Sequence, residues 1–238
     1  MKNKIPYIHY ENIHNRNSAE EIVPYIIELF NPESILDIGC GTGTWLKSAE
    51  TLGVKKIFGV DGEYINKNQL EISQENFMSY NLQKVLNLNE KYSITLCLEV
   101  AEHLDEKYSD NLITSLVNHS DIVIFSAALP YQGGQNHVNE QDFGYWIEKF
   151  KKHNYKPLDI VREKFWNNSK VNWWYKQNIF VYTNRREIIE KYESAKPINT
   201  YIHPILFQLC AKELERLNNN NSSAYKIFKS LIKKIINI

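Results

Sequence analysis

The chain has 238 residues, of which 43% are hydrophobic, and this is enough for one large domain with appendages and too much for a wholly disordered chain. Lys and Arg number 28, as do Asp and Glu, so a formal net charge of zero argues against a nucleic acid or an anionic bilayer as the main partner. Three widely spaced cysteines, Cys40, Cys97 and Cys210, exclude a disulfide framework.

The first residues are polar and aromatic, unlike a signal peptide, and no run of about 18 apolar residues predicts a transmembrane segment. With the sparse cysteines, this predicts a cytoplasmic location. The segment that contains Tyr7, His9, Tyr10 and His14 has no core of its own, so we expect it to fold over the functional crevice as a lid.

The first predicted helix covers residues 18–30, where apolar side chains recur at helical spacing. Ser18 and Glu21 have the spacing of a capping box at its start. Pro24 either kinks this helix or moves its start to Val23.

Strand-like segments then alternate with helical patterns, which predicts a parallel, doubly wound sheet. The segments are residues 34–38, 55–61, 77–80, 92–98 and 121–126. Two later segments, residues 155–166 and 177–184, are separated only by a loop and are predicted to pair antiparallel at the sheet edge. The expected fold is α/β, a Rossmann-like doubly wound sheet that is parallel with an antiparallel edge hairpin, plus a C-terminal helical appendage.

We expect a main domain over residues 1–184 and a helical extension over residues 185–238. A low-complexity linker from Leu217 to Ala224 interrupts the extension. The last predicted helix has an apolar face opposite a row of lysines, which favours docking on its own domain or a homodimer through C-terminal helices, with a membrane surface as the alternative.

A glycine cluster, Gly39, Gly41 and Gly43, lies between the first strand and the next helix. Such glycines let an anionic ligand approach backbone N–H groups at the helix start. The dinucleotide fingerprint needs a glycine at position 44, where the chain has Thr44, and this weakens an assignment to NAD. Asp61, at the end of the second strand, is placed to accept both ribose hydroxyls of an adenosine.

This cluster, with Asp37 before it and Asp61 after it, resembles motif I and the following acidic position of class I S-adenosylmethionine-dependent methyltransferases, over about residues 18–184. The resemblance implies S-adenosylmethionine as the cofactor. It places Asp37, Gly39, Gly41 and Trp45 around the methionine part, Asp61 at the ribose, and Asn81 and Leu82 at the adenine. Many relatives have Asp where Asn81 stands, although an Asn still offers one donor and one acceptor.

Glu99, Glu102 and His103 follow the fourth strand in the segment LCLEVAEHL, so a helix there would put them on one face. His137, after the fifth strand, is expected to return over the same crevice. Two carboxylates and two imidazoles suit Mg²⁺ or Mn²⁺, and the histidines favour Mn²⁺. Such an ion lowers the pKa of a coordinated hydroxyl and directs its attack on a methyl group.

The set is similar to the E-x-x-E-H motif plus distal histidine of the small-RNA 2′-O-methyltransferases, and the stretch also resembles that of ubiquinone-pathway O-methyltransferases. In many class I relatives such a stretch only packs the fold, and His137 would then act alone as a general base. The predicted catalytic residues are His137, Glu102 and Glu140.

The loop PYQGGQNHVNEQ and the aromatic-rich segment after it resemble methyltransferases of bacterial surface-glycan and nucleotide-sugar pathways. The implied reaction is O-methylation of a sugar hydroxyl in a nucleotide-linked, capsule or lipopolysaccharide precursor, with or without a metal. The loop supplies polar groups for such a substrate, and one of two tryptophans could cover a sugar face while the other packs in the core. These residues are Gln132, Gln135, Asn136, Asn139, Glu140, Trp173 and Trp174.

Two alternatives stay open at this point. One is an RNA ribose 2′-O-methyltransferase, which the zero net charge and the lack of a recognisable RNA-binding module disfavour. The other is a non-catalytic scaffold that binds S-adenosylmethionine, which the complete set of acidic and histidine side chains disfavours.

Overall fold

The computed structural model describes residues 16–193 and 198–219 of the chain. The chain divides into two compact units, residues 1–200 and 201–238. The described part of the second unit contains the helix α8 (Pro204–Asn219). Within the described ranges, no helix combines the length and the apolar character that crossing a bilayer requires.

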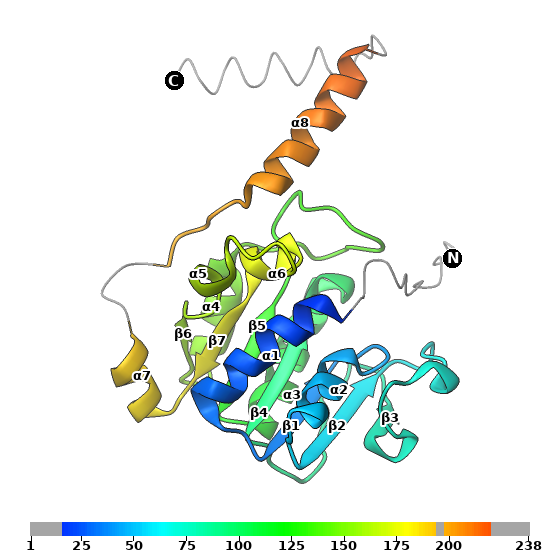
Figure 1. Cartoon of the computed structure of the whole chain (residues 1–238), viewed down its shortest axis with the longest axis vertical. Coiled ribbons are helices and arrows are strands. Elements are labelled where there is room, and N and C mark those ends of the chain that lie inside the picture. Colours follow the sequence, from blue (N-terminus) through cyan, green and yellow to red (C-terminus); the bar gives the residue numbers. More distant parts are fainter. Residues whose placement is uncertain (1–15, 194–197, 220–238) are drawn as a thin grey trace. The chain divides into compact units, whose positions relative to one another are not determined.

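The first unit is built on a seven-stranded sheet in the order β3-β2-β1-β4-β5-β7-β6, with helices on both faces (Figure 1). The strands are β1 (Ser34–Ile38), β2 (Lys56–Asp61), β3 (Phe77–Ser79), β4 (Ile94–Leu98), β5 (Ile122–Ser126), β6 (Lys156–Leu158) and β7 (Phe180–Thr183). The pairs among β1 to β5 are parallel, whereas β7 runs antiparallel to both β5 and β6. The predicted Rossmann-like sheet with its antiparallel edge hairpin is therefore confirmed.

The α-helices of this unit are α1 (Asn17–Phe30), α2 (Thr44–Thr51), α3 (Ser109–His119), α4 (Phe143–Lys151), α5 (Arg162–Phe165), α6 (Trp173–Asn178) and α7 (Arg186–Tyr192). Successive residues of a strand point to opposite faces of the sheet, so each strand contributes side chains to the cores on both faces. On β1, Ile35 packs in the core that contains α1 and α2, while Leu36 and Ile38 pack in the core that contains α3 and α4.

The start of α1 differs from the prediction. The helix begins at Asn17, and its N-cap residue makes no side-chain capping bond, so the capping box is wrong. Ser18 instead accepts a hydrogen bond from the Asn172 backbone N–H, and Glu21 pairs with Lys170. Long-range contacts to the segment before α6 have replaced the local cap. The helix continues through the exposed Pro24.

Two predicted segments are only partly extended. In the segment of residues 155–166, only the three residues of β6 are extended, and the chain then forms α5. The segment expected to be a loop before residue 177 contains most of α6. The predicted linker from Leu217 overlaps the end of α8 as far as Asn219. The expected lid at the N-terminus and the basic last helix lie outside the described residues.

The carboxyl ends of the parallel strands meet at one edge of the sheet. The Gly39 N–H donates to the Val60 carbonyl at 2.7 Å, and the Glu99 N–H donates to the Ser126 carbonyl at 3.0 Å. Because β7 is antiparallel, its amino end arrives at this same edge, where Phe180 pairs with Phe125. All segments with predicted site residues therefore converge there.

Candidate functional site

The loop after β1 is shaped by its glycines. Gly39, Gly41 and Gly43 have φ angles of 88°, 55° and 88°, a region that side chains with a Cβ rarely adopt. A Cβ on Gly39 would lie 2.3 Å from a methyl group of Val100, which follows Glu99 after β4. The predicted cofactor loop and the predicted chemistry loop are thus in direct contact.

Asp61, at the end of β2, stabilises this glycine loop through hydrogen bonds. Its carboxylate is 3% exposed and accepts hydrogen bonds from the backbone N–H groups of Gly41 at 2.7 Å and Gly62 at 2.6 Å, and from the Tyr64 hydroxyl. Burial, and then the charge of Asp61, raise the pKa of the nearby Asp37 well above its usual range. Two carboxylates flank the glycine loop at adjacent strand ends, which fits a site for the polar part of an adenosine cofactor.

The other residues predicted to bind the cofactor lie at the start of α2 and after β3. Trp45 lies in the first turn of α2 and packs edge to face with Tyr175, with ring centroids 5.1 Å apart. Asn81 is exposed, and its side-chain oxygen accepts from the Gln83 N–H at 3.0 Å, while Leu82 is half-buried. Both follow β3, the strand that pairs with β2.

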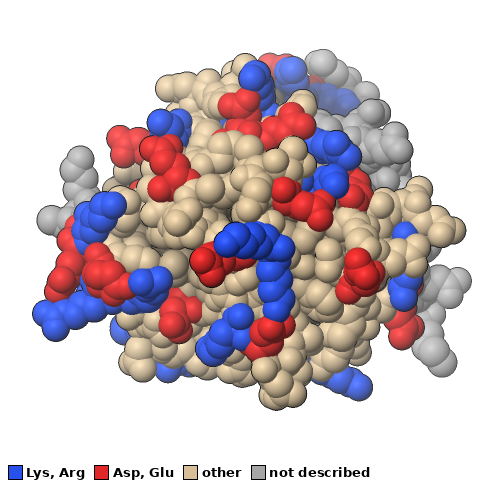
Figure 2. Space-filling view, turned by 60° about the horizontal axis from the view of Figure 1, so that its bottom comes forward, with Lys and Arg blue, Asp and Glu red and all other residues tan. Residues whose placement is uncertain are grey.

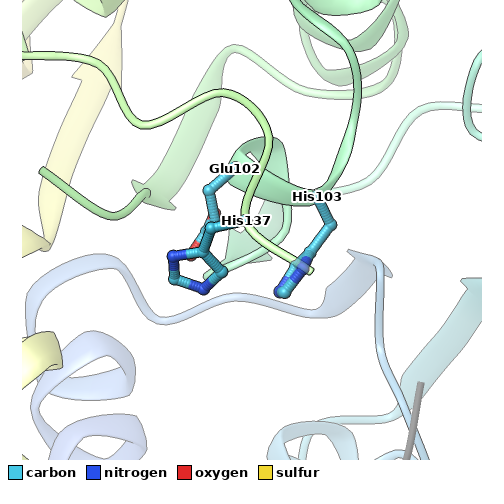
Figure 3. A group of neighbouring side chains, drawn as sticks. All are labelled: Glu102, His103 and His137. Carbon is cyan, nitrogen blue, oxygen red and sulfur yellow. The ribbon is translucent and has the colours of Figure 1, made fainter. Parts of the chain in front are cut away.

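Glu102, His103 and His137 come together at the ends of β4 and β5 (Figure 3). Glu102 and His103 belong to the short 3-10 turn η3 (Ala101–His103), and His137 comes from the loop between β5 and α4. Each offers a potential ligand atom, and these atoms lie within 4.8 Å of one another. The two imidazole rings meet edge to face at 4.9 Å.

Glu102 is the least solvated member of this cluster. It is fully buried, and neither of its carboxylate oxygens has a donor in good hydrogen-bond geometry among the described residues, although the backbone N–H groups of Glu102 and Ala128 and the Glu99 carboxylate lie close enough to shift its pKa. Burial, reinforced by the nearby Glu99 carboxylate, raises the pKa of Glu102 well above its usual range. Burial and the neighbouring His137 lower the pKa of His103 to about 4, which keeps this imidazole neutral at neutral pH. A buried acceptor without a donor beside a neutral imidazole fits a bound cation.

Glu99 does not share a helical face with Glu102 and His103 as predicted, although its carboxylate lies beside that of Glu102. It adopts a left-handed backbone with φ of 55°, and η3 begins only at Ala101, so the expected shared helical face does not form. The Glu99 carboxylate instead accepts from Gln132 Nε2 at 3.2 Å and from Asn178 Nδ2 at 3.2 Å. Burial raises the pKa of Glu99, although these donors oppose the shift.

Gln177 and Asn178, which end α6 one residue before β7, are buried beside Glu99, and the sequence pattern did not indicate them. The side-chain oxygen of Gln132 accepts from Asn178 at 2.9 Å and from Gln177 at 3.3 Å, so the three amides and Glu99 form one network. Two consecutive amides directly before an apolar strand were a usable signal, but the direction of β7 decides that they reach this edge.

Glu140 organises the loop that carries His137. Its carboxylate accepts from the backbone N–H of Tyr131 at 2.8 Å, from that of Gly133 at 2.7 Å and from His137 Nδ1 at 2.9 Å. Asn139, predicted to face the substrate, is buried and donates to Ser109 at 3.1 Å. Its amide thus supports the fold beneath the loop.

Trp173 and Trp174 begin α6 and contact each other edge to face, with ring centroids 5.7 Å apart. Both are half-buried, and Trp174 also contacts Tyr175. The pair thereby continues the aromatic packing that reaches Trp45, and a role for either ring against a sugar stays a prediction.

Comparison with known proteins assigns this architecture. A family model described as a methyltransferase domain matches residues 10–178. No curated protein sequence gives a significant match.

Solved structures share the fold at low sequence identity. Magnesium protoporphyrin IX methyltransferase (ChlM) from Synechocystis PCC 6803 with bound SAH is 15% identical, with 75% of this chain and 89% of that chain covered and a TM-score of 0.55. The methyltransferase domain of bacterial CtHen1 is 18% identical, with 71% and 97% covered and a TM-score of 0.53. Streptomyces venezuelae DesVI is 11% identical, with 71% and 92% covered and a TM-score of 0.54.

Proposed function

The chain belongs to the methyltransferase-domain family and is an S-adenosylmethionine-dependent methyltransferase, and we propose that it methylates a sugar hydroxyl of a nucleotide-linked or surface-glycan precursor with metal assistance. The observation that carries the proposal is the cluster of Glu102, His103 and His137, whose ligand atoms lie within 4.8 Å beside the glycine loop. When bound, S-adenosylmethionine supplies an electrophilic methyl group, so these side chains would act on the acceptor oxygen.

In this proposal the ends of β1, β2 and β3 would hold the cofactor. Asp61 would accept the ribose hydroxyls, and the N–H groups at the start of α2, with Asp37 and Trp45 beside them, would surround the methionine part. Asn81 and Leu82 would flank the adenine. The contact between Gly39 and Val100 supports this placement, because it brings the glycine loop against the segment that holds the acidic and histidine cluster.

Glu102, His103 and His137 would hold Mn²⁺ or Mg²⁺, and the two imidazoles favour Mn²⁺. The buried oxygens of Glu102 that have no donor support this role, since a buried carboxylate requires a cation, a donor or a proton. Such an ion would acidify a hydroxyl bound to it and fix the direction of that hydroxyl. Glu99, held by Gln132 and Asn178, would add a second carboxylate charge next to the ligands.

His137 is oriented for either of its two proposed roles. A carboxylate can only accept, so the bond to Glu140 places the proton of His137 on Nδ1 and leaves a lone pair on Nε2. That lone pair can bind a metal or take the proton of the acceptor hydroxyl. In the second case His137 is the general base and no ion is required.

The local charge favours a neutral polyol as the group nearest the cluster. No Lys or Arg occurs from Ala127 to Glu148, or from Ile94 to Glu106, which together supply the cluster. A phosphate backbone is normally matched by several cationic side chains. The absence of basic residues from these two segments favours a glycan hydroxyl over an RNA end. The face shown in Figure 2, which brings the bottom of Figure 1 forward, carries interspersed Lys, Arg, Asp and Glu side chains.

The test is methyl transfer by the purified full chain after chelation, with and without added Mn²⁺. The acceptors are a panel of nucleotide sugars, short neutral glycans, and an RNA oligonucleotide with either a free or a 2′-O-methylated 3′-terminal ribose. We expect Mn²⁺-dependent transfer to a sugar of the first two classes. Transfer only to the free RNA end establishes the RNA ribose alternative, which the same side-chain cluster would also serve. Binding of S-adenosylhomocysteine without transfer to any acceptor establishes the scaffold alternative.

A further inference from the structure

Tyr64 contacts the carboxylate that the proposed cofactor site depends on. It lies three residues beyond Asp61 in the segment after β2, and its hydroxyl donates to Asp61 Oδ1. The residue is 58% exposed, so its ring lies at the surface while its hydroxyl reaches a buried acid. A tyrosine in this arrangement can leave the carboxylate by rotating into solvent without disturbing the core.

Most acceptor positions of the Asp61 carboxylate are already used by hydrogen-bond donors of the protein. An ionised carboxylate offers about four lone-pair sites. At least three donors already use them: the N–H of Gly41 on Oδ2, and the N–H of Gly62 and the hydroxyl of Tyr64 on Oδ1. The two backbone donors are fixed by the fold. Two ribose hydroxyls therefore cannot both be accepted while the Tyr64 hydroxyl stays in place.

Gly62 creates the space for the tyrosine ring. A Cβ at this position would lie 2.3 Å and 2.6 Å from two ring carbons of Tyr64. The ring therefore lies directly over the Gly62 backbone. The space that the ring occupies requires a glycine there, whereas the φ angle of Gly62 is not positive and does not require one. Any side chain at position 62 would push the ring away from Asp61.

We infer that the Tyr64 hydroxyl occupies the position of one ribose hydroxyl on Asp61 in the free enzyme and leaves it when the cofactor binds. The inference rests on the proposed placement of the ribose at Asp61. Tyr64 keeps the buried carboxylate satisfied between turnovers, and it makes affinity depend on whether the incoming ligand carries ribose hydroxyls. It is a specificity-determining residue that competes with one part of the cofactor.

The consequence is a measurable reduction of affinity in the native protein. A ligand that must first displace a closed conformer binds more weakly by the fraction of open conformer. Removing the hydroxyl should tighten binding of S-adenosylhomocysteine by about three- to tenfold. A ligand without ribose hydroxyls has no need to displace Tyr64, so its affinity should not respond.

The experiment is calorimetric titration of Tyr64→Phe with S-adenosylhomocysteine and with its 2′,3′-dideoxy analogue. We expect the first to tighten and the second to stay within about twofold of the native value. Tyr92→Phe is the matched control, because Tyr92 also donates to a carboxylate, that of Glu90 at 3.2 Å, before the start of β4. Weaker binding of S-adenosylhomocysteine, or an equal shift for both ligands, overturns the inference.

Gly62→Ala gives an independent second route, since the added methyl group displaces the ring while the backbone donor remains. It should reproduce the selective tightening seen with Tyr64→Phe. Asp61→Asn distinguishes an error in the proposed cofactor placement from an error in the role assigned to Tyr64. If Asp61→Asn leaves affinity for S-adenosylhomocysteine unchanged, the cofactor placement itself is wrong. If Asp61→Asn weakens binding but neither Tyr64→Phe nor Gly62→Ala tightens it, only the role of Tyr64 is overturned.

Discussion

The Nδ1 atom of His137 donates to Oε1 of Glu140 at 2.9 Å, within a loop that the same carboxylate holds closed through two backbone N–H groups. The His137 and Glu140 side chains are 12% and 19% exposed, so this pair is shielded from most solvent competition. The sequence predicts that Glu140 is catalytic, and from these contacts we expect it to act through His137. In this role it would orient the imidazole, select its tautomer and hold the loop.

Glu140→Gln should lower turnover by about 10- to 100-fold, the usual loss when the partner behind a working histidine is changed. The amide keeps the shape of the side chain but supplies one acceptor where the loop uses two. Affinity for S-adenosylhomocysteine should stay within about twofold. Glu148→Gln, at an exposed acid of α4 that pairs with Lys151, is the control. Parallel losses of turnover and cofactor affinity would contradict a role through His137.

Exhaustive chelation should reduce turnover by at least two orders of magnitude, roughly 2.7 kcal/mol of barrier, and Mn²⁺ or Mg²⁺ should restore it. Chelation should leave affinity for S-adenosylhomocysteine unchanged, because the ion acts on the acceptor oxygen. Ala substitutions at Glu99, Glu102, His103 and His137 should each mimic the chelator. Full activity in a chelated protein that contains no metal by elemental analysis would leave His137 as the base, and His137→Ala alone would then be severe.

Glu102→Met should stabilise the metal-free protein while it abolishes turnover. The substitution removes a buried carboxylate that lacks donors and replaces it with an apolar side chain of similar length. Relief of that burial cost should raise the free energy of unfolding by about 1–3 kcal/mol in the presence of chelator. Urea denaturation of both proteins, with and without Mn²⁺, measures this. Only the native protein should gain stability from Mn²⁺, and a less stable variant under chelation would refute the unpaired carboxylate.

Asp61→Ala should weaken binding of S-adenosylhomocysteine by removing two charge-assisted hydrogen bonds, each worth about 1.5–3 kcal/mol before water compensates. The substitution also removes the acceptor of the Gly41 N–H, so the glycine loop loses its brace. Calorimetry gives the affinity, and a thermal melt shows that the variant is folded. Glu63→Gln, two residues away and exposed, should bind normally. Unchanged affinity in a folded Asp61→Ala protein would remove Asp61 from the cofactor site.

Gln132→Leu should lower turnover by about tenfold or more without changing cofactor affinity. The leucine cannot donate to Glu99, and it leaves the buried amides of Gln177 and Asn178 without the oxygen they share. Glu99 then loses part of its orientation beside Glu102. Separate measurements of kcat and of S-adenosylhomocysteine binding distinguish this from a general loss of structure, which would reduce both.

The sequence was sufficient for the sheet and for the strand ends, because buried parallel strands are apolar runs that stop at Gly39, Asp61 and Glu99. It also brought His103 and His137 to one place, since carboxyl ends of parallel strands share an edge. It failed at Glu99, where helical spacing was assumed and the backbone is left-handed. Contacts between distant segments also determine the start of α1, where the Ser18 hydroxyl accepts a hydrogen bond from the Asn172 N–H and does not cap the helix.

The reversed direction of β7 determines which part of the chain can be altered to change the site. Asn178 enters beside Glu99 because it precedes an antiparallel strand, so the connection from Asp159 to Gln177 sets what arrives there. Lengthening or shortening that connection changes the partners of Glu99. An insertion after Thr183 instead falls at the amino ends of the parallel strands, opposite the site, because Thr183 pairs with Ile122. Combinatorial variation aimed at acceptor choice therefore belongs before β7, and affinity tags or fusions belong after it.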